Sequence, residues 1–284
     1  MLKQYYELTK PGIIYGNAMT ATAGFLLAEK GHFNIALFLA TIVGLSLVIA
    51  SGCVFNNYLD RYIDGRMQRT KDRPMVLKLL PVKTVLTYGS ILGLLGAAVL
   101  FFFTNLLTAG IAAGGFFFYV FVYTPLKRRT IHSTLLGGIA GAVPPVVGYC
   151  AVTNHFDLAA LLLFLILMLW QLPHFYSIAI YRLKDYTAAS IPILPVKKGV
   201  LVTKIQMVVY IIFFTLAAVM LSVLHYTGTT YLIIAALLGL TWLGFSLKGF
   251  TTKNETAWAR KMFFISLIVL TLLSLTISLT VVLP

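Results

Sequence analysis

The sequence predicts an all-α polytopic membrane protein with nine transmembrane helices. Hydrophobic residues make up 60% of its 284 residues and charged residues only 11%, whereas a soluble domain is about 25% charged and about 45–50% apolar. Apolar runs recur along the whole chain, and each is close to the roughly 20 residues that a helix needs to cross a bilayer. No linker or change of composition separates parts of the chain, so residues 1–284 are expected to form a single intramembrane domain.

The apolar runs are separated by polar connections of unequal length. Residues 56–83 and 181–204 form the two longest connections, and both follow an apolar run that ends in polar residues. The fifth run contains Pro144 and Pro145, which should break or kink its helix. The predicted spans are residues 13–28, 35–55, 82–103, 106–124, 134–152, 158–180, 204–224, 231–247 and 263–283.

Lysine and arginine are distributed unevenly between these connections. If successive connections alternate between the two sides of the membrane, every Lys and Arg except Lys30 falls on the side of the N-terminus. The positive-inside rule then places the N-terminus in the cytoplasm and the C-terminus outside. The net charge of +14 is explained by this topology and by attraction to anionic lipid or an anionic substrate, so no nucleic-acid partner is expected. The first residues lack the features of a signal or transit peptide, which favours a bacterial cell (inner) membrane.

The second apolar run ends in a candidate metal site. Asn56, Asp60 and Asp64 are spaced four residues apart, which places them on one helical wedge about 80° wide and about 12 Å long. Carboxylates at the end of a membrane helix are costly unless they face water or a partner. Mg²⁺ is usually held by one or two carboxylates and substrate phosphates, and the adjoining Arg69 and Arg73 suit such phosphates. The alternative is a frayed helix end with solvated charges.

A second motif lies at the end of the sixth run. His174, Tyr181 and Asp185 are spaced seven and four residues apart, so on a continuous helix they fall within about 40° of one another. His174 would then lie about 16 Å deeper in the membrane than Asp185. Ionisable residues inside a membrane often face a functional cavity; the alternative for His174 is a structural hydrogen bond to a neighbouring helix.

A third motif is the cytoplasmic turn that contains Tyr123, Lys127 and Arg128. Its cations can clamp an anionic group, or they can serve as a topology signal alone.

Two acidic helix ends facing one cavity would repel a diphosphate, but Mg²⁺ and basic residues between them reverse that repulsion. The pattern therefore predicts a metal-bound diphosphate whose apolar remainder lies in the membrane, as in a polyprenyl diphosphate. Cleavage of its C–O bond gives an allylic cation for an electron-rich acceptor, and an apolar cavity keeps water away.

These motifs resemble those of the UbiA-type intramembrane prenyltransferases, and within that family the branch that farnesylates haem. The resemblance covers essentially the whole chain. The pattern of residues 56–64 is shared by the superfamily, whereas residues 173–175 (Pro-His-Phe) and 185–195 are more specific to the haem branch. In that branch Tyr181 stands where other members carry the first Asp of the second motif. Further matching strings are residues 8–11, 67–74, 123–130 and 137–145.

The resemblance implies that farnesyl diphosphate donates its farnesyl group to a vinyl group of haem B, and that water then adds to give haem O. It implies a requirement for Mg²⁺, with the ligands Asn56, Asp60, Asp64 and Asp185. His174 would meet the haem or steer the proton and water step, and Tyr181 would join the catalytic residues. The implied substrate-binding residues are Asn56, Lys10, Arg69, Arg73, Tyr123, Lys127, Arg128 and Lys184. The implied surroundings are the lipid bilayer, a cytoplasmic-facing active site, and contact with a haem A synthase or a terminal oxidase assembly.

The sequence departs from the haem branch at a few positions. Gly12 replaces a frequent Arg, which affects an expected phosphate or propionate contact. Ser133 replaces an Asn, and Ser190 and Ile193 replace a Gly and a Met.

The sequence alone leaves several other functions open. An aromatic quinone precursor is the alternative acceptor. A CDP-alcohol phosphotransferase is suggested by Asp64-Gly65 and Arg69, but Arg61 stands where that motif needs another Asp. A cation-site transporter would carry its acids near the middle of the membrane, and a haem-binding protein without catalysis would not need two acidic motifs.

Overall fold

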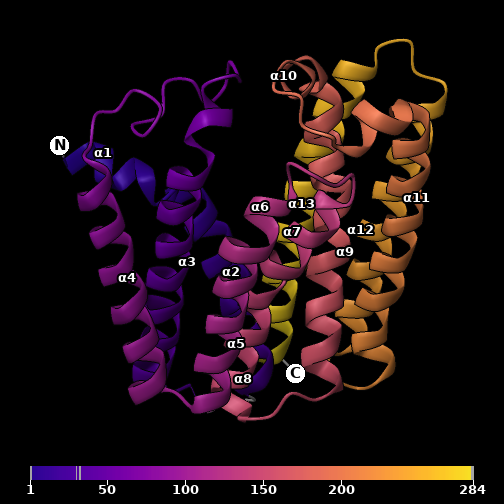
Figure 1. Ribbon diagram of the computed structural model, residues 1–284. Coiled ribbons are helices and arrows are strands. Elements are labelled where there is room, and N and C mark those ends of the chain that lie inside the picture. The colour runs from indigo at the N-terminus through magenta and orange to yellow at the C-terminus, as the bar shows by residue number, and fades with distance from the viewer. Residues whose placement is uncertain (1, 30, 32, 283–284) are drawn as a thin grey trace.

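The computed structural model describes residues 2–29, 31 and 33–282, and every regular element among them is helical (Figure 1). The all-α prediction is confirmed. The elements are α1 (Leu2–Leu8), α2 (Pro11–Glu29), α3 (Ile35–Asp64), α4 (Val82–Phe103), α5 (Leu106–Phe117), the π-helix η1 (Phe118–Tyr123), α6 (Thr124–Leu126), α7 (Ser133–Gly141), α8 (Val143–Thr153), α9 (Leu158–Tyr181), α10 (Leu183–Ala188), α11 (Leu194–Val223), α12 (Thr229–Leu247), the 3₁₀-helix η2 (Lys248–Phe250) and α13 (Glu255–Val282).

Eight helical segments in the described part of the chain are long and apolar enough to cross a membrane. They correspond to eight of the nine predicted spans. The remaining span, predicted at residues 13–28, forms α2, whose 19 residues include Asn17, Thr20 and Thr22. These polar residues lower its hydropathy, and the count of nine therefore stays a prediction.

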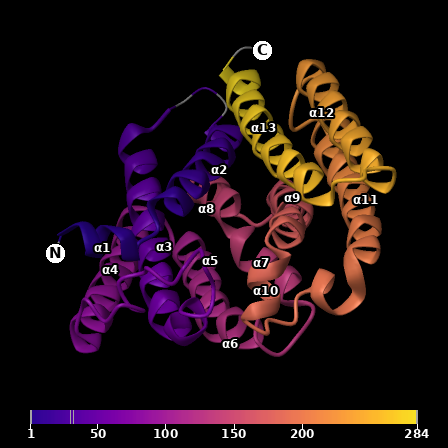
Figure 2. The same cartoon turned by 90° about the horizontal axis from the view of Figure 1, so that it is seen from above.

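The long helices stand side by side and surround a central region, which is visible in the view along the bundle (Figure 2). Helix α4 packs on α3 at one side of the bundle, whereas α11 and α12 pack outside α9 and α13 at the other. The largest apolar cluster is centred on α9, α11, α12 and α13, extends to α2 and α8, and contains the fully buried side chains of Phe214, Tyr231 and Trp242. This arrangement leaves α2, α3, α5, α7, α9 and α13 around the centre.

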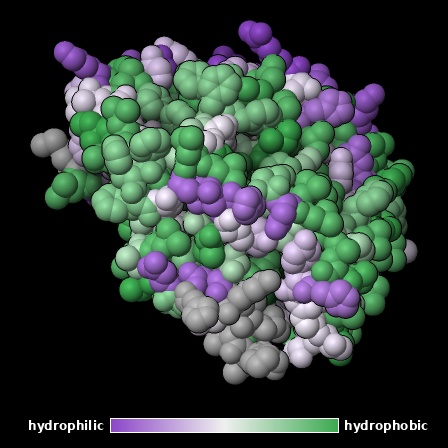
Figure 3. All heavy atoms as spheres, turned by 90° about the horizontal axis from the view of Figure 1, so that it is seen from below, coloured by the Kyte–Doolittle hydropathy of each residue, from purple (hydrophilic) through white to green (hydrophobic). Residues whose placement is uncertain are grey.

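The two ends of the bundle differ in character. The long segment between α3 and α4, the short helix α10 and the connection from α12 to α13 lie at the same end (Figure 1). These segments carry eight of the 22 lysine and arginine residues, and the alternation of connections assigns all eight to the same side of the membrane. The opposite end is dominated by hydrophobic residues, with hydrophilic residues in a few groups (Figure 3). Which end faces the cytoplasm stays a prediction from the positive-inside rule.

Two predicted spans contain a break, and a third helix is kinked just before its predicted span. In the fifth predicted span, α7 ends at Gly141 and α8 begins at Val143, just before Pro144 and Pro145. The predicted proline break is therefore confirmed. The fourth changes from α5 into a π-helix before the basic turn. Helix α11 starts ten residues before its predicted span and kinks at Gly199, whose φ of 83° lies in the left-handed region that favours glycine.

Helices α2 and α8 approach each other closely because glycine lies at both contacts. A Cβ atom added to Gly24 would lie 2.0 Å from the carbonyl oxygen of Pro145, and one added to Gly148 would lie 2.0 Å from that of Ala21. Small residues at such positions let membrane helices pack backbone to backbone. This contact fixes α2, and with it the residues that α2 presents to the centre of the bundle.

We expect Gly148→Ala to destabilise the protein, because the added methyl group must push α2 and α8 apart. Overpacking of this kind costs about 1–3 kcal/mol. Thermal or denaturant unfolding of the purified protein in detergent measures the change. Gly114→Ala in α5 is the matched control, since nothing lies within 4 Å of its added Cβ; equal stability of the two variants would contradict the close-packing interpretation.

Candidate active site

The acidic residues of α3 lie on one buried face near its end. Helix α3 continues without a break to Asp64, so Asn56, Asp60 and Asp64 stack on successive turns as predicted. Their side chains are buried, and Asp60 is only 1% exposed. All three line a cavity of about 760 Å³ in the centre of the bundle, a size typical of ligand pockets.

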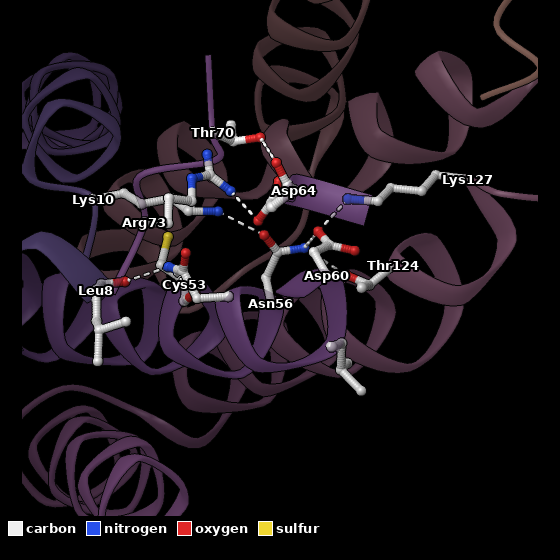
Figure 4. Close-up of polar contacts among 12 residues, drawn as sticks. Leu8, Lys10, Cys53, Asn56, Asp60, Asp64, Thr70, Arg73, Thr124 and Lys127 are labelled. Carbon is white, nitrogen blue, oxygen red and sulfur yellow. Dashed lines mark hydrogen bonds and ion pairs between the residues drawn. The ribbon is translucent and has the colours of Figure 1, made fainter. Parts of the chain in front are cut away.

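The two buried carboxylates of α3 are each paired with a cation from outside that helix (Figure 4). Asp60 forms an ion pair with Lys127, which follows α6, and its other oxygen lies 3.5 Å from Arg128. The Nδ2 group of Asn56 donates to Asp60 at 2.8 Å. Arg73 donates to Asp64 at 2.6 Å. Buried charges require such partners, because an unpaired carboxylate in this environment would be strongly destabilising.

Lys10 joins the same group from the turn between α1 and α2. Its Nζ donates to Oδ1 of Asn56 at 2.6 Å, and its backbone adopts a left-handed conformation with φ 52°. Burial and the nearby cations Arg73 and Lys127 together lower the pKa of Lys10 to about 8, against the opposing effects of Cys53 and Asp60. Lys10 is therefore a cation held in place by a crowded basic environment, a setting in which added anionic charge would be stabilised.

The basic turn is positioned by the π-helix that precedes it. The rings of Tyr119 and Tyr123 stack with centroids 5.5 Å apart, and both line the cavity. Thr124 donates to the carbonyl of Tyr119 at 2.8 Å and accepts from Asn56 at 3.1 Å. The single π-turn thus aims the tyrosines and Lys127 at the acidic end of α3, and π-helices are frequent at functional sites.

The loop after α3 closes the polar end of the cavity. The hydroxyl of Thr70 donates to the backbone carbonyl of Asp64 at 2.8 Å, which folds the loop back over the helix end. Arg69 and Arg73 from this loop line the cavity, as does Tyr186 from α10. Burial raises the pKa of the Tyr186 phenol, and Arg69 opposes that shift. The loop therefore contributes two more basic side chains to a site that already contains Lys10 and Lys127.

The second motif does not form the continuous helical face that its spacing predicts. Helix α9 ends at Tyr181, and Arg182 adopts a non-helical conformation before α10 begins. Asp185 lies 3.8 Å from Arg182 and does not belong to the cavity wall, so the predicted geometry is wrong at this point. Among the described residues no three His, Cys, Asp or Glu side chains come close enough to share a metal ion. The proposed ligand role of Asp185 stays a prediction.

Three further predicted residues lie outside the cavity wall. Lys184 is exposed on α10, and Arg128 reaches the carbonyl of Leu59 beside Asp60. Tyr181 packs against Phe263, with centroids 6.0 Å apart, and near the guanidinium group of Arg260. Their proposed roles in substrate binding and catalysis stay predictions.

His174 lines the deeper part of the cavity. Its ring stacks on Trp170 and packs against Phe263, with centroids 4.6 and 4.9 Å away. Its Nδ1 lies 2.7 Å from the hydroxyl of Ser266 on α13. His174 thus makes the structural hydrogen bond to a neighbouring helix that was the alternative to a functional role. Its ring also lines the cavity.

Comparison with known families shows to which protein family the chain belongs. Residues 17–268 match the model of the UbiA prenyltransferase family. The chain belongs to this family. It is therefore a prenyltransferase with the intramembrane helical fold of that family.

This UbiA prenyltransferase is similar over its full length to curated relatives. It is 53% identical over 277 residues to the protoheme IX farnesyltransferase of Protochlamydia amoebophila, with 98% of both chains covered. It is 51% identical over 279 residues to the protein of that name from Serratia proteamaculans, with 98% of this chain and 94% of the relative covered.

Solved structures of low sequence identity share the fold. A digeranylgeranylglyceryl phosphate synthase superposes with a TM-score of 0.82 at 18% identity, over 99% of this chain and 98% of the other. A UbiA homologue from Archaeoglobus fulgidus bound to DMAPP and Mg²⁺ superposes with a TM-score of 0.69 at 12% identity, over 97% and 99% of the two chains.

Several residues of the site in this UbiA prenyltransferase have no clear sequence signal. Thr124, Gln171 and Ser266 are ordinary polar residues in or next to apolar runs, and their roles depend on neighbours that are distant in the chain. Asn57 was also not predicted from the sequence, although it adjoins Asn56. Its buried amide donates to the carbonyl of Leu8 at 2.9 Å and so fastens the N-terminal segment to α3.

We expect Asn57→Ala to reduce stability, because it leaves the buried carbonyl of Leu8 without this donor. The loss of a partner from a buried polar group costs about 1–3 kcal/mol. Unfolding in detergent measures the change, and Asn17→Ala is the control, since that partly exposed amide donates only within its own helix. Equal stability of the two variants would contradict an anchoring role for Asn57.

Proposed function

We propose that this prenyltransferase transfers the farnesyl group of farnesyl diphosphate to a vinyl group of haem B and adds water, giving haem O. The observation that carries the proposal is a single cavity that joins a charged end to an aromatic interior. The charged end suits a diphosphate, and the interior suits an isoprenoid chain and a flat aromatic acceptor. The names of relatives that are about half identical over their full length support the same acceptor and donor.

Mg²⁺ fits the donor set of the charged end. Asp60 and Asp64 are hard oxygen donors on successive turns of one rigid helix, with the amide of Asn56 beside them. Mg²⁺ is commonly bound by such carboxylates together with substrate phosphates. When bound, the ion would neutralise the diphosphate and stabilise it as a leaving group. The Archaeoglobus fulgidus homologue solved with DMAPP and Mg²⁺ is consistent with this assignment.

The basic residues would hold the diphosphate. Lys127 and Arg73 now neutralise Asp60 and Asp64, and they lie in the cavity wall with Lys10 and Arg69. Charge-assisted hydrogen bonds from such cations to phosphate oxygens are strong. Their positive charge also favours departure of the diphosphate, because negative charge develops on the leaving oxygen.

The deeper part of the cavity would protect and direct the carbocation. After the C–O bond breaks, the farnesyl cation is attacked by the terminal carbon of the vinyl group, which forms the new C–C bond. Water captures the resulting cation next to the porphyrin and releases a proton. Apolar and aromatic walls, including Tyr119, Phe116 and Trp170, exclude other water until that step.

The first test is to incubate the purified protein in detergent with haem B, farnesyl diphosphate and Mg²⁺, and to examine the porphyrins by mass spectrometry. We expect a product with the mass of haem B plus a farnesyl group and a hydroxyl group, and we expect this product to be absent in EDTA. Asp60→Asn should reduce the rate at least about 10²-fold, in the range known for groups that stabilise transition-state charge. Asp72→Asn, in the exposed part of the same loop region, should leave the rate unchanged.

The outcomes separate the elements of the proposal. Release of diphosphate without a modified haem would move the acceptor to another compound, with aromatic quinone precursors next to be tested. Folded protein that does not consume farnesyl diphosphate would overturn the proposed reaction. An active Asp60→Asn variant would overturn the assignment of the site.

A further inference from the structure

His174 is held on several sides in the deeper part of the cavity. Trp170 and Phe263 pack against the ring, and Phe175 contacts it with a centroid distance of 5.3 Å. The indole of Trp170 also donates to the backbone carbonyl of Ser266 at 2.7 Å. The same residue of α13 therefore receives hydrogen bonds from two positions of α9, one helical turn apart, and rotation of the imidazole is restricted.

The hydrogen bonds around Ser266 determine which nitrogen of His174 carries the proton. The hydroxyl of Ser266 lies 2.6 Å from the carbonyl oxygen of Phe263. A carbonyl can only accept, so the single hydroxyl proton is used in that bond. Nδ1 of His174, 2.7 Å from the same hydroxyl, must then be the donor. Neutral His174 is consequently protonated at Nδ1, and its Nε2 carries a lone pair.

Nothing in the described part of the chain uses that lone pair. Nε2 forms no hydrogen bond with any described residue, and it is not among the enclosed polar atoms there that lack a partner. His174 itself belongs to the cavity wall. The lone pair is therefore available to a molecule inside the cavity.

The surroundings favour a neutral role for the imidazole. A general base must become an imidazolium, and in hydrolases a carboxylate behind the ring stabilises that charge. Here the group behind the ring is a serine hydroxyl, and the other contacts are aromatic. A charge in such an apolar setting is costly. Coordination of a metal through Nε2 needs no charge, and metal-bound histidines usually donate their other N–H to an oxygen acceptor.

We propose that Nε2 of His174 is an axial ligand of the iron of the haem substrate, and that Ser266 is the positioning residue that holds the required tautomer. This inference rests on the proposed function, which makes haem the acceptor. Neutral imidazole is a common iron ligand in haem proteins. The bond places the iron against α9, so it fixes the porphyrin inside the cavity while the diphosphate occupies the charged end.

The test uses the full-length protein loaded with haem B in detergent, without farnesyl diphosphate. After reduction, resonance Raman spectroscopy should show an iron–histidine stretching band in the wild type. The band should be absent in His174→Gly and return when imidazole is added, which also shows that the variant is folded. Ser266→Ala should shift the band and weaken haem binding on the order of 10-fold, as for other residues that orient a metal ligand. Ser274→Ala, a buried serine of the same helix, should change neither.

The proposal and the reaction can fail separately. If the wild type makes haem O but its bound ferrous haem lacks the band, or if the band persists in His174→Gly without imidazole, iron ligation by His174 is overturned while the reaction stands. An unchanged band in Ser266→Ala would overturn the positioning role alone. If the band appears as expected but no haem O is formed, the ligation stands and the proposed reaction is overturned.

Discussion

The burial of two carboxylates at the end of α3 is the constraint on which the site depends. Asp60 and Asp64 lie in a protein interior that tolerates such charges only with partners. The partners come from elsewhere: Lys127 follows the π-helix and α6, and Arg73 belongs to the loop after α3. Neutralising the acidic helix end therefore brings the polar ends of distant segments together, and these segments form the charged end of the cavity.

The carboxylates and cations of these ion pairs can exchange their present partners for other charged groups that enter the cavity. Removing one member of a buried pair is far more costly than replacing it with another suitable charge. If a divalent cation takes over the carboxylates, Lys127 and Arg73 are released next to the phosphates that arrive with it. Each positive group then still faces a negative one, so the exchange avoids leaving any buried charge unpaired. The close packing of α2 on α8 and the anchoring of Leu8 by Asn57 keep Lys10 within reach of this exchange.

The sequence could predict features that depend on local spacing. The wedge of Asn56, Asp60 and Asp64 formed because α3 stays helical to its end, and the break before Pro144 follows from the chemistry of proline. The common helical face predicted for His174, Tyr181 and Asp185 does not form, because the backbone at Arg182 leaves the helical conformation. The pairing of His174 with Ser266 joins residues 92 positions apart, and no local pattern encodes the approach of α13 to α9.

The two ends of the cavity differ in the chemistry of the side chains that line them. The carboxylates and cations of the cavity wall lie at the charged end, whereas the deeper end contains the neutral imidazole of His174 among aromatic rings. Hard ions such as Mg²⁺ prefer carboxylates and phosphates, while imidazole suits iron. A metal-bound diphosphate and a haem would thus be sorted to opposite ends by ligand type alone. The chain of a prenyl donor held at the charged end must then extend toward the acceptor, which is the direction that the transfer requires.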